Sequence, residues 1–464
     1  MWYSEMSMRS YQEALAYLEQ FADYEKVRSA SYTPGTFDLG RIEALLAGLG
    51  NPHRRYQIVH VAGSKGKGSV CAIVESVLRA AGFRTGLYTS PHLHTFRERI
   101  RVSGALIARA EVLTLANELA PHVEAIPGLT WFEIVTAMGL VYFARQGVEV
   151  AVVEVGLGGR LDATNVVSPL VSVITSLSLE HTAWLGNTLA QIAAEKAGII
   201  KPGVPVVSAP QAPEALQVIQ RRCAELNSPL TLVGRDWNME YGAITWEGQN
   251  FFVVPPGQSR FRGLPSKRVS FFVNLAGRHQ AINATVALAA LAPLGPAGLE
   301  ISPRAMREGL QRVKWPGRME ILSADPLLVC DGAHNGDSAR QLVAALREWF
   351  PGQDWTLIFG ASSDKDFGAM FDALVPFAGR IVLTRARHPR AADPERLAEL
   401  VRERGNQAQV ANDLAEALDI ALAPSGAGTA TIVAGSLFAA ADARFAWAQR
   451  SGATLPETDD QESS

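Results

Sequence analysis

A glycine-rich segment between an apolar run and a helical pattern constrains the fold of this chain more than any other feature. Residues 60–70 read HVAGSKGKGSV. The glycines let the backbone curl so that successive N–H groups point at one anion, and the positive end of the following helix adds to that field. Lys67 can reach terminal phosphates, and Ser69 can bind a phosphate oxygen or a metal. The segment predicts a nucleoside triphosphate site, although its spacing, GxxGKGS instead of GxxxxGKS, leaves open a plain glycine-rich turn with solvated lysines.

The overall charge gives no reason to expect that a polyanion binds anywhere else. The 464 residues carry 43 Lys and Arg against 46 Asp and Glu, for a formal net charge of −3. We therefore expect no nucleic-acid or membrane partner, and a polyanion must be captured by a local site. Three cysteines are too few for a disulfide framework, and the first residues lack the pattern of a signal peptide. We expect a cytoplasmic protein that is a monomer.

Short apolar runs alternate with helical patterns along most of the chain, which predicts an α/β protein with parallel sheets covered on both faces. Residues 239–254 break this rhythm and predict a small antiparallel insertion, and a proline- and glycine-rich stretch at 293–298 predicts a linker. We predict two domains, at 1–296 and 297–450, and a disordered acidic tail at 451–464. Strands are expected near residues 58–62, 86–89, 150–155, 171–177, 204–209, 230–233, 327–330, 355–359, 381–384 and 429–433.

Several sequence blocks, taken in order, resemble one enzyme family. They are GSKGKGS at 63–69, YTSPHL at 88–93, VEVGLGGRLDATN at 153–165, LEHT at 179–182, EKAGIIK at 195–201, WPGRME at 315–320, DGAHN at 331–335 and AGSLF at 434–438. The set resembles folylpolyglutamate synthase/dihydrofolate synthase, the folate branch of the Mur ligase superfamily. The resemblance implies a P-loop ATPase-like N-terminal domain and a Rossmann-like C-terminal domain.

The resemblance also implies a reaction and its small-molecule partners. ATP would phosphorylate a carboxylate of dihydropteroate or of a reduced folate, and the amine of L-glutamate would then displace phosphate to form an amide. ATP is the implied co-substrate, and Mg²⁺, as two ions, is the implied cofactor. Because two anions must meet, cations have to neutralise both of them before reaction.

The family motifs imply roles for individual residues. ATP binding is implied for Gly63, Ser64, Lys65, Gly66, Lys67, Gly68, Ser69, Asn283, Arg318, Asp331 and His334. Magnesium coordination is implied for Ser90, Glu154, His181 and, if it is carbamylated, Lys196. Catalytic roles are implied for Lys67, Lys196 and His334. Loops at 363–367 and 388–391 are expected on the substrate side of the second domain.

Without the family, several of these residues allow other interpretations. Glu154 ends a predicted buried strand, where a carboxylate is costly unless it is paired or metal-bound. His181 is an unusual ligand for Mg²⁺, so the residue alone suggests zinc or a hydrogen bond. Lys196 also fits a lysine favoured by the helix dipole before a glycine cap. Asn283 also fits a packing residue on a helix.

Two other functions stay open as alternatives: another amide ligase of the Mur superfamily, and a nucleotide-binding module without catalysis. Cell-wall ligases carry a UDP-binding domain before the P-loop, whereas only 62 residues precede Gly63 here. A regulatory module would not need phosphate ligands in a second domain, yet Arg318, Asp331 and His334 offer them.

Overall fold

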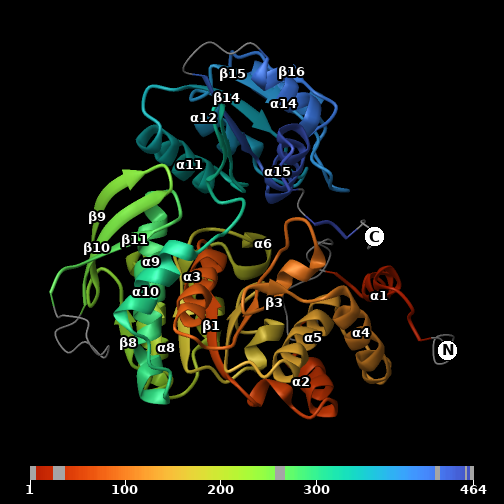
Figure 1. Cartoon of the computed structure of the whole chain (residues 1–464), viewed down its shortest axis with the longest axis vertical. Helices are drawn as coiled ribbons and strands as arrows, with labels where there is room; N and C mark the ends of the chain where they lie inside the picture. Colours follow the sequence, from red (N-terminus) through yellow and green to blue (C-terminus); the bar gives the residue numbers. More distant parts are fainter. Residues whose placement is uncertain (1–6, 24–36, 256–266, 424–428, 455–456, 460–464) are drawn as a thin grey trace.

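The alternating apolar runs form two separate sheets, which lie one above the other in the long direction of the molecule (Figure 1). The computed structural model describes residues 7–23, 37–255, 267–423, 429–454 and 457–459. The first sheet has eight strands in the order β4-β3-β2-β5-β1-β6-β7-β8. Their bounds are β1 Gln57–Ala62, β2 Thr85–Tyr88, β3 Ile100–Val102, β4 Ala105–Leu106, β5 Val150–Glu154, β6 Val171–Ile174, β7 Val206–Ser208 and β8 Leu230–Leu232.

Six of these strands are parallel, as predicted, and β3 and β4 add an antiparallel edge that the sequence analysis did not predict. Alternate side chains of each central strand enter different cores: Val59 and Val61 belong to one cluster and Ile58 to the other. Helices therefore cover both faces, as a buried parallel sheet requires. They are α1 Tyr11–Leu18, α2 Leu39–Gly48, α3 Lys67–Ala80, α4 Arg109–Glu124, α5 Trp131–Arg145, α6 Thr182–Leu185, α7 Leu189–Lys196, α8 Pro213–Glu225, α9 Arg278–Leu291 and α10 Pro303–Arg312.

The second sheet has six strands in the order β12-β13-β17-β14-β15-β16, and only β12 is antiparallel to its neighbour. The strands are β12 Glu320–Ala324, β13 Leu327–Cys330, β14 Asp354–Phe359, β15 Arg380–Leu383, β16 Gln409–Val410 and β17 Thr429–Ala434. The helices are α11 Gly336–Trp349, α12 Phe367–Leu374, α13 Pro394–Arg402, α14 Leu414–Leu422 and α15 Leu437–Ser451. The first three pack in one cluster and the last two in another, one on each face. The predicted two-domain α/β fold is confirmed.

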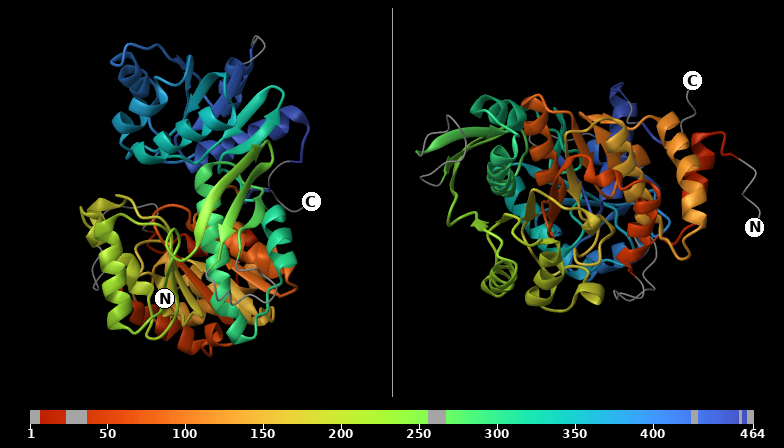
Figure 2. Two further views of the ribbon diagram at one scale, coloured as in Figure 1. Left: turned by 90° about the vertical axis from the view of Figure 1, so that its left-hand side faces the viewer. Right: turned by 90° about the horizontal axis from the view of Figure 1, so that it is seen from below.

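The antiparallel insertion predicted at 239–254 forms β9 (Asn238–Thr245) and β10 (Gly248–Val254), and β11 (Val269–Val273), outside the predicted range, completes a three-stranded sheet. It projects from the first domain toward the second (Figure 2). Trp246 at its turn packs on Phe350, with ring centroids 5.2 Å apart. The insertion therefore supports the second domain from one side.

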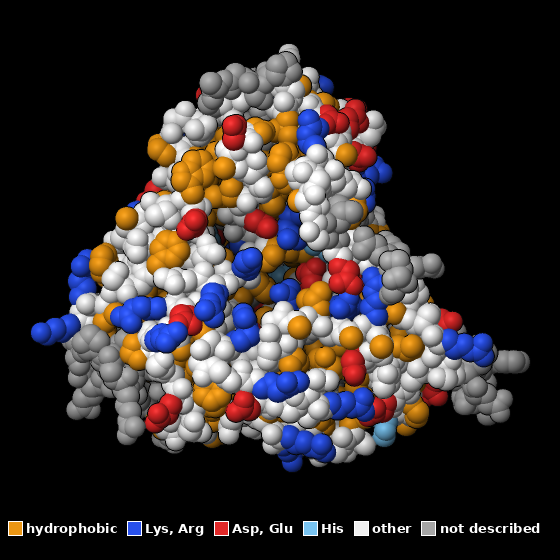
Figure 3. Space-filling view, in the orientation of Figure 1, with side chains coloured by type: hydrophobic (Ala, Val, Ile, Leu, Met, Phe, Trp, Pro, Cys, Tyr) orange, Lys and Arg blue, Asp and Glu red, His pale blue; other side chains and the backbone are white. Residues whose placement is uncertain are grey.

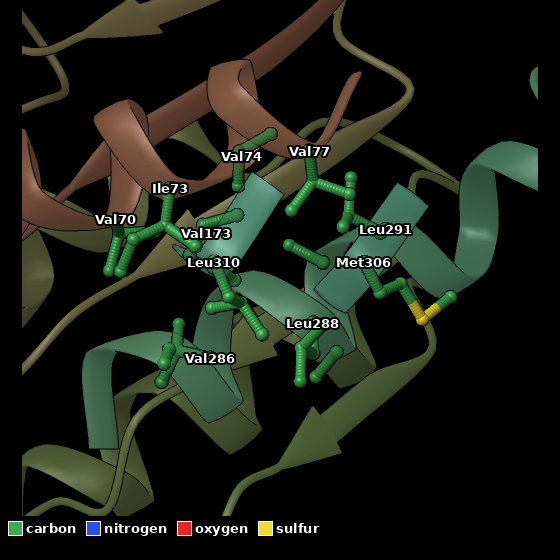
Figure 4. Close-up of a cluster of buried hydrophobic side chains, with 14 of the residues drawn as sticks. Val70, Ile73, Val74, Val77, Val173, Val286, Leu288, Leu291, Met306 and Leu310 are labelled. Atoms are coloured by element: carbon green, nitrogen blue, oxygen red, sulfur yellow. The ribbon is translucent and has the colours of Figure 1, made fainter. Parts of the chain in front are cut away.

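The first domain extends past the predicted boundary at residue 296. Residues 292–297 form a short 3-10 helix between α9 and α10, and α10 packs on α3 and α9 in the core of the first domain (Figure 4). Met306 and Leu310 of α10 are fully buried there. The proline-rich stretch connects two helices of one domain, because the apolar face of α10 continues that core. The chain crosses to the second sheet between α10 and β12.

Close backbone contact between α10 and α3 gives a stability prediction. A Cβ atom on Gly309 would lie 2.4 Å from Val77 Cα, and the Gly309 carbonyl accepts a hydrogen bond of 2.8 Å from Ser76 Oγ. Gly309→Ala should lower the free energy of unfolding by about 1–3 kcal/mol, because the two helices must separate. Urea denaturation measures the change. Gly379→Ala, where a Cβ meets nothing within 4 Å, is the control; an equal effect of both would contradict the prediction.

The acidic tail is described only at 451–454 and 457–459, where it differs from its predicted disorder, and the rest of the prediction lies outside the described residues. Helix α15 extends to Ser451, and residues 457–459 contact the first domain, because Arg97 and Arg109 there meet the acidic side chain of Glu457. Within the ranges that the structure describes, every helix is too short or too polar to cross a bilayer.

Candidate active site between the two domains

A cavity of about 900 Å³ lies between the domains, and both domains line it. In the space-filling view the molecule is hollowed between its upper and lower parts, and Lys and Arg side chains surround the opening (Figure 3). From the first domain the cavity receives the loops that follow β1, β2 and β5. Ligands of parallel sheets bind at these carboxyl ends, so the cavity lies where the topology places a site.

The glycine-rich segment forms the loop between β1 and α3, as predicted. Gly66 precedes α3 with φ of +85°, and a Cβ there would lie 2.4 Å from Asn283 Oδ1. No side chain caps α3, so its first N–H groups are available to an anion. The predicted loop residues from Ser64 to Ser69 all line the cavity, whereas Gly63 packs beneath it against Thr175.

Two lysines of this loop differ in their contacts. Lys67 Nζ donates to the Gly63 carbonyl at 3.1 Å, which folds its side chain back over the loop. The buried Lys65 Nζ has no hydrogen-bond partner among the described residues. Burial lowers the pKa of Lys65, although the negative charge of nearby Glu180 acts in the opposite direction. A buried ammonium without a partner is costly, so the loop is built to receive a negative charge.

Glu154 occupies the predicted position at the end of β5. Burial raises the pKa of this carboxyl to about 7, although Lys67 opposes the shift. It accepts one long hydrogen bond of 3.3 Å from the Ser90 N–H. Glu154, Ser90 and Ser69 line the cavity together, and such a small set of oxygens suits Mg²⁺, which shares its remaining positions between water and phosphate. The residues present therefore fit the predicted cation.

Lys196 is a buried residue in the last turn of α7, the position that the helix-dipole interpretation also gives it. Its Nζ donates to the Gly63 carbonyl at 2.8 Å and to Glu180 Oε1 at 3.0 Å. Lys196 and then Lys67 hold the pKa of Glu180 well below its usual range, although burial alone would raise it. Glu180 was missed in the sequence because a charged residue in a loop has no periodicity. His181, in a left-handed conformation with φ of +47°, places its side chain at the cavity.

The second domain contributes three of the predicted residues. Arg318 lines the cavity and has no hydrogen bond or ion pair to another described residue. Asp331 accepts hydrogen bonds from the backbone N–H groups of Met319 and Ala333 at 2.8 and 2.7 Å, so it fixes the backbone beside Arg318. His334 Nδ1 donates to the Gly332 carbonyl at 2.9 Å, which leaves Nε2 without a proton. Burial, and then Lys65, lowers the pKa of His334 to about 3.

The remaining predicted groups also reach the cavity. Asn283 Nδ2 donates to Gln280 Oε1 at 3.0 Å, and both residues line the cavity beside Gly66. The two expected substrate-side loops meet, because Ser363 N donates to the Arg390 carbonyl at 2.8 Å. Lys365 and His388 of these loops line the same cavity. Trp315 was missed: it packs on Gly68, where a Cβ would come within 2.7 Å of its ring.

A buried histidine beneath the site gives a pH prediction. His60 Nε2 donates to Thr164 Oγ1 at 2.8 Å, and Thr164 donates in turn to Asp162 Oδ1 at 2.5 Å. Burial, and then Lys201, lowers the pKa of His60 to about 3, whereas the unfolded chain binds this proton near the ordinary value of 6.5. The unfolded state therefore gains a proton first, and stability falls as pH drops from about 6.5 toward 3.

The contribution of His60 is complete above pH 6.5, and each pH unit below costs up to about 1.4 kcal/mol. Denaturant unfolding from pH 4 to 8 should show a smaller slope for His60→Gln than for the wild type. Equal slopes would contradict this placement of the histidine. His122→Gln, at a half-buried histidine near the end of α4, controls for the substitution itself.

Comparison with known proteins supports the same family from two directions. Residues 61–291 match the Mur ligase middle domain, and residues 317–437 match the Mur ligase glutamate ligase domain. The dihydrofolate synthase/folylpolyglutamate synthase of Bacillus subtilis is 38% identical over 362 residues, which cover 76% of this chain and 82% of that protein. A probable bifunctional folylpolyglutamate synthase/dihydropteroate synthase of Haloferax volcanii is 37% identical over 93% of this chain, which spans 50% of that longer protein.

The fold of solved relatives agrees. The structure of Mycobacterium tuberculosis folylpolyglutamate synthase complexed with ADP and AMPPCP is 32% identical, with a TM-score of 0.83 over 94% of this chain and 98% of that one. The folylpolyglutamate synthase of Thermotoga maritima is 34% identical, with a TM-score of 0.79 over 94% and 96%. The chain therefore belongs to the folylpolyglutamate synthase/dihydrofolate synthase family of Mur ligases.

Proposed function

We propose that this chain is an ATP-dependent ligase that joins L-glutamate to a carboxylate of a folate. One observation carries the proposal: unpaired cations from both domains, Lys65 and Arg318, face a single cavity that also contains the buried carboxylate of Glu154. A reaction between ATP and a carboxylate needs this arrangement, because both reactants are anions. The relatives are named dihydrofolate synthase and folylpolyglutamate synthase, which supports folates as the substrate class. The family resemblance implies either dihydropteroate or a folate that already carries glutamate.

The residues divide the work by position. The loop N–H groups and Lys67 would hold the β- and γ-phosphates, and Asn283, beside Gly66, would contact the nucleoside. Glu154 and Ser90, with His181 of the same cavity, would hold Mg²⁺, which when bound neutralises phosphate charge. Arg318 would bind the transferring phosphoryl group from the opposite side, in an orientation fixed by Asp331.

His334 would act as a neutral side chain. Its Nδ1–H is used by Gly332, so the free Nε2 can only accept a hydrogen bond at neutral pH. We propose that it accepts from the incoming ammonium group of glutamate, which must lose protons before it attacks the acyl phosphate. Closing of the two domains over the cavity would exclude water from that intermediate.

Lys196 carries a separate proposal, carbamylation at Nζ. Burial lowers the pKa of Lys196, and this favours the neutral amine that can attack carbon dioxide with loss of a proton. The product is a carbamate anion beside the carboxylate of Glu180. Bound Mg²⁺ would be needed to offset the repulsion between these two negative groups. A mass increase of one carbon dioxide on the peptide containing Lys196, in protein trapped under native conditions, would support this modification.

We further propose that the enzyme works as a cytoplasmic monomer, because one chain supplies both halves of the site. The function is tested by incubating the protein with ATP, Mg²⁺, glutamate and either dihydropteroate or a tetrahydrofolate. Phosphate release should require a pterin substrate and should match amide product by mass. Phosphate release independent of the pterin would refute the folate assignment and favour another Mur-type ligase. Nucleotide binding without any turnover would favour the non-catalytic module.

A further inference from the structure

An acidic segment near the end of the chain, residues 457–459, is bound at the edge of the cavity. Asp459 Oδ1 accepts hydrogen bonds of 2.5 Å from Tyr11 Oη and from Thr95 Oγ1. Its Oδ2 accepts from the Phe96 backbone N–H at 2.8 Å. The Asp459 carbonyl accepts from Gln12 Nε2 at 2.7 Å. One carboxylate thus receives three hydrogen bonds from groups of the first domain.

The other two residues of the segment meet arginines. Glu457 forms ion pairs with Arg97 and with Arg109, whose Nε lies 3.5 Å from Glu457 Oε1. Arg109 Nη2 also donates to the Thr458 carbonyl at 2.9 Å, and its guanidinium lies over the Tyr11 ring. The two arginine side chains are only 12% and 15% exposed. The surface therefore offers donors to two carboxylates along one extended chain.

This surface adjoins the cavity that holds the phosphate loop, because Phe96 and the bound Asp459 line that cavity. Asp459 lines the cavity together with Phe96, Trp131, Lys67 and Glu154. Burial, and then the hydrogen bond with Asp459, raises the pKa of Tyr11, so its hydroxyl remains a donor at all working pH values. A ligand reaching from the phosphate loop to this edge would have to present carboxylates to it.

We propose that Tyr11, Thr95, the Phe96 N–H, Arg97 and Arg109 form a binding site for the glutamyl chain of the substrate, and that residues 457–459 occupy this site as a competitor. The inference rests on the proposed function, because a folate that is being extended carries one free carboxylate on each glutamate. The segment is tethered to α15, so its local concentration is on the order of millimolar, and short glutamyl chains must compete with it.

Binding of a probe to a truncated protein tests the site without turnover. A chain ending at residue 456 should bind a fluorescent γ-linked triglutamate, and a peptide of residues 457–464 should displace it. The full-length chain should bind the triglutamate about tenfold more weakly, since the tethered segment occupies the site and must leave before the probe can bind. Arg97→Ala in the truncated chain should weaken binding about tenfold, whereas Arg145→Ala, on the outer end of α5, should not.

Kinetics separates the site from the proposed function. Truncation should lower KM about tenfold for a folate with three glutamates and leave KM for dihydropteroate, which carries none, unchanged. Equal triglutamate binding by the full-length and truncated chains would overturn the inference. An equal change in KM for both substrates on truncation would also overturn it, because a segment that merely held the two domains together would affect both substrates alike. Triglutamate binding in a protein without ligase activity would uphold the site and refute the proposed function. Thermal unfolding of the truncated chain, and the point variant Asp459→Asn, control for misfolding.

Discussion

Replacing Lys67 with alanine should lower kcat for ATP-dependent ligation by about 10²–10³-fold while the protein stays folded. Lys67 is the first residue of α3, and its Nζ already lies 3.1 Å from the Gly63 carbonyl, above the loop. The ammonium is placed where charge develops on the β- and γ-phosphates, so its loss removes stabilisation that the transition state needs. The fold should persist because Lys196 holds the same carbonyl from below.

The control for Lys67→Ala is Lys267→Ala, since Lys267 is exposed beside β11. Steady-state kinetics with saturating ATP gives the comparison, and unfolding curves show that each variant is folded. Unchanged kcat in Lys67→Ala would remove this lysine from the site. A large loss in both variants would point to an indirect effect of lost charge.

Replacing Arg318 with alanine should lower kcat about 10³-fold, because an arginine that contacts a transferring phosphoryl group contributes this much or more. Arg318 comes from the second domain, next to Gly332, where a Cβ would lie 2.7 Å from its Nη1. ATP binding should weaken much less, since the loop and Lys67 belong to the other domain. The variant thus separates nucleotide binding from the reaction.

The control for Arg318→Ala is Arg312→Ala, an exposed arginine of α10 that pairs with Glu308. Arg318→Lys should recover only part of the loss, because a point charge replaces a planar pair of donors. A loss of ATP affinity in Arg318→Ala with kcat unchanged would show that the residue acts in binding alone. Full activity would mean that the second domain supplies no phosphate ligand.

The sequence predicted the fold where periodicity is regular. The parallel strands and the helices between them follow from apolar runs that alternate with helical patterns. Strands β3, β4 and β16 were missed because they contain only two or three residues, too few for a period to appear. Strands β11 and β12, of five residues each, were missed as well. The boundary at 296 was misplaced because Pro293 and Pro296 mark a break between helices, and a sequence does not show which core the next helix joins.

The glycines and motif residues of the candidate site were predictable from the sequence. The residues that contact them were less predictable. Lys67, Glu154 and Arg318 follow strands or short motifs, and the cavity contains all three. Glu180 and Trp315 stand in the LEHT and WPGRME blocks, but their roles could not be assigned, because these depend on contacts with Lys196 and Gly68. Disorder of the acidic tail was predicted from composition alone. The placement of residues 457–459 depends on contacts with Tyr11 and Arg97, which no local sequence pattern connects with this segment.

The central claim is that ATP phosphorylates the substrate carboxylate in the cleft. Isotope transfer tests it most directly: a folate labelled with ¹⁸O in the carboxylate to be extended is incubated with the protein, ATP, Mg²⁺ and glutamate, and the released phosphate is analysed by mass. Attack of the carboxylate on the γ-phosphate predicts one ¹⁸O atom in each phosphate, with the other in the amide. Phosphate without ¹⁸O would contradict an acyl-phosphate intermediate.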